Sequence, residues 1–297
     1  MTAPGAEKLS WSEAGIKVAD VDRALAELRA EAASDHPSMR TSVMTHIAWV
    51  PEEWADQARR ALAGMAEQHP SRTILLLPEP NAGESRLDGT VSLETYQVPG
   101  SDRHIVTEVI ELRLLGPRAL APASIVLPLL ISDLPVFLRW RGEPSWGSDE
   151  LRQLVAVADR LVVDSTEWDG LPHAYGQLAR LFEDIVVSDI AWARTSRWRR
   201  LLASLWPDIA GVGRIRVRGT EAQALLLAGW LRSRLERDDI AVEHVDAERL
   251  EGIDLDGEPA PFPPGDPPAP SDVLSEELET YGRDSVYEDA VRAAATG

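Results

Sequence analysis

In the first part of the chain, segments whose apolar residues have the spacing of a helix take turns with segments that have the pattern of a strand. In 11–32 a strand or an extended arm precedes a helix, where Val21, Leu25 and Leu28 recur on one face. A stronger helical stripe runs through 51–69, with Pro51 at its first turn and acidic residues behind it. Between and after these helices the β-branched, alternating or continuously apolar runs predict strands. The predicted strands are 41–50, 71–80, 89–98 and 104–116, and the last two favour an antiparallel ribbon.

The middle of the chain predicts a helix, a strand, a helix and a strand before a boundary. Residues 117–130 form a buried helix edged by prolines, and the strand of ISDLPVFLRWRGEPSW (131–146) follows it. Ser148 is the predicted N-cap of a helix over 148–159. The buried strand 160–165 then leads to TEWDGLP (166–172), whose composition is typical of a boundary.

A second run of strands and helices follows the boundary. Thr220 and Gln223 have the spacing of a capping box at the start of the helix 220–236. Residues 186–207 are predicted to begin extended and to become helical near Thr195. The other predicted elements are a helix over 173–185, strands over 213–219 and 240–246, a proline-rich stretch over 258–270 and one or two short acidic helices over 271–294.

Alternation of buried strands with helices predicts an α/β fold. We expect two consecutive α/β sections with a mixed sheet and helices packed on the sheet, followed by a proline-rich linker and an acidic helical tail. The expected domains are an N-terminal α/β domain over 1–165, a C-terminal α/β domain over 166–257, and the linker and tail over 258–297.

Charge and composition exclude several classes of chemistry. The chain has no cysteine, which excludes disulfides, Fe–S clusters, cysteine-ligated zinc and a cysteine nucleophile. Lys8 and Lys17 are the only lysines, so a Walker A or Schiff-base lysine is not expected in the folded body. The net charge of −19 disfavours nonspecific nucleic-acid binding. The polar N-terminus and the lack of a long apolar run predict a soluble cytoplasmic protein.

No motif in the sequence predicts a catalytic or metal site. None of the six histidines lies within four residues of another, and no GxSxG elbow is present. We therefore predict no catalytic residue, metal or cofactor. Three aspartates stand beside buried strands, namely Asp133, Asp164 and Asp189. At such a position an aspartate is a helix cap, a turn residue or an ion-pair partner. For Asp189 the candidate partner is Arg194.

Tryptophan and arginine gather in two short stretches. The first holds Arg139, Trp140 and Arg141, and the second, IAWARTSRWRRLLASLW, holds Trp192, Arg194, Trp198 and Arg199. Ten tryptophans stand against three phenylalanines, an excess that hints at interface or stacking use. Three interpretations stay open for the second stretch. It is a core helix with a solvated cationic edge, an anion clamp, or a hot spot for a protein partner.

These stretches resemble the glucose-6-phosphate dehydrogenase assembly protein family, OpcA. The resemblance rests on ISDLPVFLRWRGEP, RLVVDS, DIAWARTSRWRRLLA, RTSVMTHIAWV with TILLLPEP, and the closing EELETYGRDSVYEDAV, all in the family's order. It implies a chain without catalysis that binds glucose-6-phosphate dehydrogenase and favours its active oligomer, at the entry to the oxidative pentose phosphate pathway. Cyanobacterial members are associated with cysteine-based redox control, in which a chain without cysteine cannot take part.

The resemblance gives the two Trp/Arg stretches a candidate role. We hypothesise that Arg139, Trp140 and Arg141 form a partner-facing or architecture-fixing corner next to Trp192, Arg194, Trp198 and Arg199. In the competing account Trp140 is buried and Arg141 pairs with Asp164 or Asp189.

Alternatives also stay open for the tail and for the whole chain. The tail, with Leu274, Leu278, Tyr281 and Tyr287, is a docking element, a helix folded on its own body, or disordered. A second function is a sugar-phosphate enzyme or sensor with an arginine clamp and Asp164 or Asp189 as base. A third is a module that binds single-stranded nucleic acid.

Overall fold

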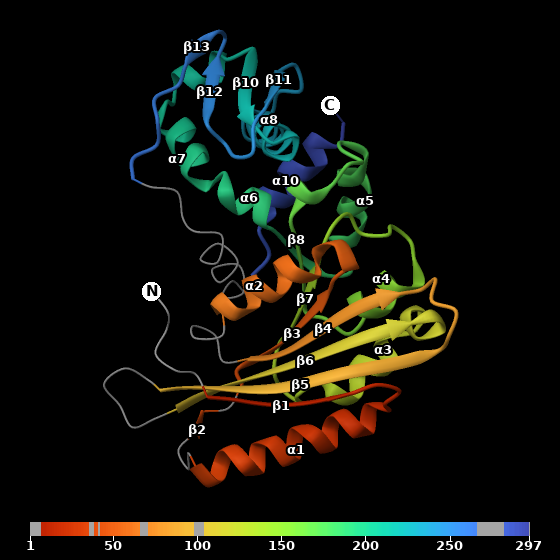
Figure 1. Ribbon diagram of the computed structural model, residues 1–297. Helices are drawn as coiled ribbons and strands as arrows, with labels where there is room; N and C mark the ends of the chain where they lie inside the picture. Colours follow the sequence, from red (N-terminus) through yellow and green to blue (C-terminus); the bar gives the residue numbers. More distant parts are fainter. Residues whose placement is uncertain are drawn as a thin grey trace. The chain divides into compact units, whose positions relative to one another are not determined.

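The computed structural model describes residues 7–35, 39–40, 42–65, 71–97, 104–265 and 282–296 (Figure 1). The chain divides into two compact units, Met1–Leu161 and Val162–Gly297. Each unit contains strands and helices, which confirms the predicted α/β class with a mixed sheet. Within the described part of the chain, no helix is both long and apolar enough to cross a membrane.

The first unit is built on a mixed sheet. Its strand order is β1-β5-β6-β4-β3-β7, and the short β2 pairs with β6. The central strands β6, β4, β3 and β7 are parallel neighbours, whereas β5 pairs antiparallel with both β6 and β1. The predicted antiparallel ribbon is therefore confirmed. The strands are β1 (Glu7–Glu13), β2 (Met39–Arg40), β3 (Met44–Trp49), β4 (Ser71–Glu79), β5 (Arg86–Gln97), β6 (His104–Leu115) and β7 (Val136–Trp140).

Helices pack on this sheet because each buries its apolar stripe against the apolar side chains of the strands. β3 is buried along its whole length, and Ala55 and Ala58 of one helix pack on Ala48 and Leu75 in a hydrophobic cluster beside it. The helical elements of the unit are α1 (Val18–Asp35), η1 (Glu52–Trp54), α2 (Ala55–Met65), η2 (Gly116–Leu120), α3 (Pro122–Val126), η3 (Leu127–Leu129) and α4 (Asp149–Val155). Ser148 caps α4, and its hydroxyl accepts a hydrogen bond from the backbone N–H of Leu151.

The predicted single helix over 117–130 is wrong. The segment forms three short pieces instead, η2, α3 and η3. Pro117, Pro122 and Pro128 each stand at the first or second position of one piece. A proline inside a helix lacks the N–H donor and clashes with the preceding turn, so each proline restarts the helix rather than continuing it.

The second unit holds two strand groups and the remaining helices. β8 (Arg160–Val163) begins just before the boundary between the units, and its neighbour is β9 (Val186–Asp189). A smaller sheet has the order β11-β10-β12-β13, with β11 parallel and β12 antiparallel to the central β10. Its strands are β10 (Arg214–Gly219), β11 (Ala241–Asp246), β12 (Gly252–Leu255) and β13 (Glu258–Pro259). The pattern predicted β10 and β11, but β12 and β13 were not predicted.

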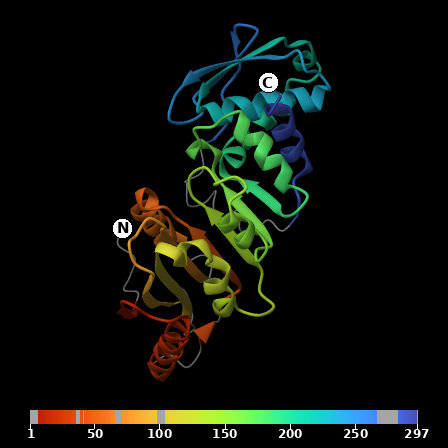
Figure 2. The same ribbon diagram turned by 90° about the vertical axis from the view of Figure 1, so that its right-hand side faces the viewer.

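One helix of this unit is buried along most of its length because it lies between other elements. α8 packs on β10 and β11, and α10 lies beside α8 in both views (Figure 1 and Figure 2). Thr220 and Gln223 form the predicted capping box of α8. The helical elements are η4 (Ser165–Glu167), α5 (His173–Leu181), α6 (Ile190–Arg194), α7 (Ser196–Ser204), η5 (Asp208–Gly211), α8 (Glu221–Leu235) and α10 (Ser285–Ala294).

One boundary in this unit differs from the prediction. Helix begins at Ile190 rather than near Thr195, because the side chain of Asp189 caps α6 by accepting a hydrogen bond from Ala191 N.

In the tail, α10 packs on its own unit, where Tyr287 and Val291 are buried against α8 and α5. Leu274, Leu278, Tyr281 and the linker from residue 266 lie outside the described residues.

Candidate functional site

The first Trp/Arg cluster lies at the end of β7, in the first unit. The indole of Trp140 is buried and stacks on that of Trp49, with ring centroids 5.1 Å apart and planes inclined by 23°. The backbone joins the same two strands, because Arg141 N donates a hydrogen bond to Trp49 O at 3.0 Å. Trp140 is 2% exposed, so its indole stabilises the packing of β3 on β7.

The two arginines beside Trp140 also bind groups of their own unit. The guanidinium of Arg141 lies 4.7 Å from the ring centre of Trp54 and donates to Gln57 Oε1 at 2.7 Å. Arg139 donates to the carbonyl oxygen of Trp140 at 2.9 Å. Both arginines are buried. The cation–π contact and the hydrogen bonds offset part of the cost of taking their charge out of water.

Gly142 closes this corner in the left-handed backbone region. Its φ is +73°, and a Cβ at this position would lie 3.3 Å from the indole nitrogen of Trp54. Glycine therefore lets the chain turn away from β7 while Trp54 stays over Arg141. Trp146 donates from Nε1 to Glu143 Oε1 at 2.8 Å just beyond the turn.

The second Trp/Arg cluster surrounds Trp192 of α6 in the second unit. The guanidinium of Arg199 lies 3.3 Å from the ring centre of Trp192 and is held by Thr195 Oγ1 at 3.0 Å. The indole N–H of Trp192 donates to Asp284, the N-cap of α10, at 2.8 Å. Tyr287 of α10 packs on the same indole, with ring centroids 5.6 Å apart. Trp192 thereby fixes the start of α10 on the body of the unit.

Asp164 and Arg194 form an ion pair near this cluster. Their N–O distance is 2.9 Å, and Asp164 is almost fully buried while Arg194 is about one-third exposed. Asp164 also caps η4 by accepting hydrogen bonds from the N–H and hydroxyl of Thr166. Asp133, by contrast, lies exposed in a turn of the first unit, with φ of +66°.

Asp189 is the centre of a buried polar network. Its carboxylate accepts hydrogen bonds from the N–H and hydroxyl of Ser165 at 3.0 and 2.6 Å, and from the phenol of Tyr287 at 3.4 Å. The Ser165 hydroxyl also lies 3.0 Å from the phenol oxygen of Tyr175. Burial, and next the charge of Asp164, raise the pKa of Asp189 to about 7. The network joins η4, β9, α5 and α10 around one carboxyl group.

The seven candidate partner residues are thus placed largely inside their units. Five of them are buried, namely Arg139, Trp140, Arg141, Trp192 and Trp198. The other two, Arg194 and Arg199, are partly buried. Trp198 contacts Phe262, with ring centroids 5.8 Å apart. The structure brings Trp192 and Arg199 together and pairs Arg194 with Asp164. Arg139 to Arg141 belong to the other unit, so a joint partner-facing corner stays a prediction.

Several residues of these clusters were missed at the level of sequence. Trp54 and Gln57 share one face of a helical segment with spacing of three, a signal that also fits any amphipathic helix. Ser165 and Tyr175 carry no pattern that predicts a shared hydrogen bond. His46 was noted only for lacking a nearby histidine, yet it is fully buried in β3 and both its ring nitrogens lack hydrogen-bond partners among the described residues. Also among the described residues, no three histidine or acidic side chains gather as a metal site.

Two family models match the chain in succession. The first, described as the glucose-6-phosphate dehydrogenase subunit N-terminal domain, matches residues 63–180. The second, described as the C-terminal domain of the same subunit, matches residues 185–261. The chain belongs to the glucose-6-phosphate dehydrogenase assembly protein family, OpcA. The resemblance predicted from the Trp/Arg stretches is therefore confirmed, and both stretches lie inside the matched regions.

Curated OpcA relatives from cyanobacteria are similar over part of their length. A protein of Nostoc punctiforme named as an OxPP cycle protein, OpcA, is 26% identical over 189 residues, which cover 60% of this chain and 41% of the relative. A protein of the same name from Synechocystis is 26% identical over 185 residues, covering 58% of this chain and 38% of the relative. The aligned stretches span about two-fifths of these OpcA relatives.

Proposed function

We propose that this OpcA-family chain binds glucose-6-phosphate dehydrogenase and promotes its active oligomeric state without catalysing a reaction itself. The observation that carries the proposal is the match of two successive domain models described as parts of a glucose-6-phosphate dehydrogenase subunit. A protein that binds the active oligomer more tightly than the inactive one shifts the equilibrium by that difference in affinity. A tenfold difference corresponds to about 1.4 kcal/mol.

The internal geometry supports a binding protein rather than an enzyme. Asp189, Ser165 and Tyr175 bind one another in the interior, where Ser165 and Tyr175 have no exposed surface. The Asp164 carboxylate is used by Arg194 and by its own helix cap. A general base has to reach a proton of its substrate, and these carboxylates already accept bonds from the chain itself. Their role in the proposal is to hold the second unit in one shape.

A coupled kinetic assay tests the proposal. Glucose-6-phosphate dehydrogenase of the same organism is assayed by NADP reduction at subsaturating glucose 6-phosphate, with increasing amounts of this chain. We expect the rate to rise to a plateau through a lower KM or a higher kcat, and the chain alone to reduce no NADP. An unrelated protein of similar acidity is the control. A rate that stays unchanged at micromolar chain, with no complex formed, contradicts the proposal.

The same purified chain also tests the sugar-phosphate alternative. Calorimetry with glucose 6-phosphate in the absence of the dehydrogenase measures direct binding. Our account predicts no heat of binding beyond dilution. Saturable binding by the chain alone favours a sensor or enzyme instead.

A further inference from the structure

In the smaller sheet of the second unit, a helix covers one face. The other face carries exposed side chains. Along β10 the exposure alternates, because Ile215 and Val217 are buried and the side chains between them are exposed. The buried side faces α8. The exposed positions of β10 are Arg214, Arg216 and Arg218, so three arginines stand in a row on the open face.

The three arginines differ in how their charge is balanced. Arg216 lies 3.2 Å from Glu243 of β11 and 4.0 Å from Asp254 of β12, and therefore stands between two carboxylates. Arg218 is exposed, and no hydrogen bond or ion pair joins its guanidinium to any residue that the structure describes. Of these two arginines, Arg218 is therefore the one whose positive charge no described carboxylate balances.

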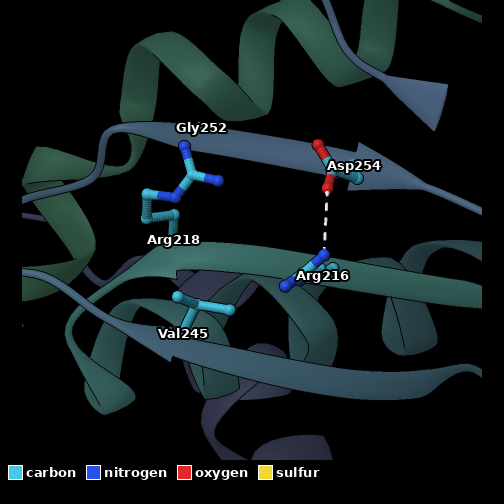
Figure 3. Close-up of a pocket in the computed structure, with 5 residues that line it drawn as sticks. All are labelled: Arg216, Arg218, Val245, Gly252 and Asp254. Atoms are coloured by element: carbon cyan, nitrogen blue, oxygen red, sulfur yellow. Dashed lines mark ion pairs between the residues drawn. The ribbon is translucent and has the colours of Figure 1, made fainter. Parts of the chain in front are cut away.

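A shallow hollow lies beside Arg218. It is lined by Arg216, Arg218, Val245, Gly252 and Asp254, and Figure 3 shows the guanidinium of Arg218 extending toward Gly252. Gly252 is the partner of Arg218 in the antiparallel pairing of β12, and its missing side chain leaves the space open. A Cβ at Gly252 would have no heavy atom within 4 Å.

The size and lining of the hollow limit what it can hold. Its volume is about 20 Å³, close to the room for one ordered water and too small for a whole metabolite. One oxygen atom of a carboxylate can enter at its mouth, and the planar guanidinium of arginine binds carboxylates through two parallel hydrogen bonds. Val245 on the rim can pack on the methylene groups of a glutamate or aspartate.

We propose that the open face of β10, with Arg218 at its centre, is the surface on which glucose-6-phosphate dehydrogenase docks through an acidic side chain. This inference rests on the proposed function and names its surface. Arg218, which has no carboxylate partner among the described residues, favours an acidic group by charge complementarity, which steers association and fixes orientation. All five residues that line the hollow lie in the region matched by the C-terminal domain model.

Charge reversal and filling of the hollow test the surface separately. Arg218→Glu reverses the free charge, and Gly252→Leu fills the space beside it without a change of charge. Binding of the dehydrogenase at low salt is measured for both variants and for the wild-type chain. Arg23→Glu is the matched control, because Arg23 is an exposed arginine of α1 in the first unit. Circular dichroism and thermal melting check that every variant is folded.

We expect Arg218→Glu to weaken binding at least tenfold and Gly252→Leu to weaken it several-fold, while Arg23→Glu stays within twofold. Wild-type affinity should also fall as salt is raised. If the wild-type chain binds and both surface variants bind equally well, this surface is wrong and the proposed function stands. If the wild-type chain does not bind, both are wrong. Saturable binding of inorganic phosphate, lost in Arg218→Glu, would overturn the choice of a protein carboxylate.

Discussion

Gly229 of α8 has no side chain, which lets α10 lie close against α8. Gly229→Ala is the sharpest test of this packing. A Cβ at Gly229 would stand 2.2 Å from the carbonyl oxygen of Ala290 and 2.9 Å from the amide nitrogen of Ala294. Both atoms belong to the backbone of α10, which cannot rotate away as a side chain would. The two helices must therefore move apart by roughly 1 Å to reach ordinary contact distances.

The size of the effect follows from what α10 buries. Tyr287 and Val291 are its larger buried side chains, each contributing about 1.5–3 kcal/mol on burial, and two buried alanines add about 1 kcal/mol each. A gap of this width removes about a quarter to a half of this total of about 5–8 kcal/mol, or roughly 1–4 kcal/mol. Alanine returns up to about 1 kcal/mol through its better helix propensity. We expect a net loss of about 1–3 kcal/mol.

Urea unfolding followed by tryptophan fluorescence measures the loss, and hydrogen exchange over 285–294 locates it. The matched control is Gly176→Ala in the middle of α5, where a Cβ would meet no heavy atom within 4 Å. The control should gain up to about 1 kcal/mol because only the propensity term applies. A Gly229→Ala chain as stable as the wild type, or one whose loss of protection lies outside α10, would refute the reasoning.

Three further predictions concern buried polar groups. Burial, and next the charge of Arg139, lower the pKa of His46 to about 4 from 6.5. The unfolded chain therefore binds the proton first, and stability falls by up to about 3 kcal/mol as pH falls from 6.5 to 4. His46→Phe should flatten this part of the wild-type curve of urea midpoint against pH, and an unchanged slope contradicts it. For Asp189 the folded pKa is raised to about 7, so its stabilising effect is complete below pH 3.8 and is lost as pH rises through 7. Asp189→Asn should reduce the loss between about pH 4 and 7 in the same measurement, and an equal loss in both chains argues against a buried carboxylate. Arg141→Met keeps the stem but removes the charge over Trp54 and the bond to Gln57, and should cost about 1–3 kcal/mol in thermal or urea unfolding. If it unfolds like the wild type but loses dehydrogenase binding, the partner-facing account of this corner is favoured instead.

Patterns within one element predicted more of the fold than relations between elements. The capping box at Thr220 and the cap at Ser148 were predictable because each needs residues only three positions apart. The antiparallel pairing of β5 with β6 was predictable because both strands alternate and follow each other closely. The helix over 117–130 was mispredicted because its apolar content favours one helix, whereas Pro122 and Pro128 each begin a new short helical segment.

The candidate site could be predicted only as residue types. The excess of tryptophan and arginine marked two stretches, but the burial of their side chains depends on partners far away in sequence. Trp140 is buried because Trp49 stacks on it, and Trp192 because α10 returns to it from about ninety residues further along. The sequence predicted a strand over 213–219, yet which of its arginines lacks an acidic neighbour depends on the pairing of β10 with β11 and β12.

Sedimentation velocity of this chain mixed with glucose-6-phosphate dehydrogenase of the same organism tests the central claim most directly. Each protein is run alone and then together at micromolar concentration and low salt, with the dehydrogenase detected by its activity across the boundary. The account predicts a faster boundary that contains both proteins and a larger fraction of dehydrogenase in its active oligomer. Two boundaries that move as they do in the separate runs, with the dehydrogenase oligomer unchanged, would contradict it.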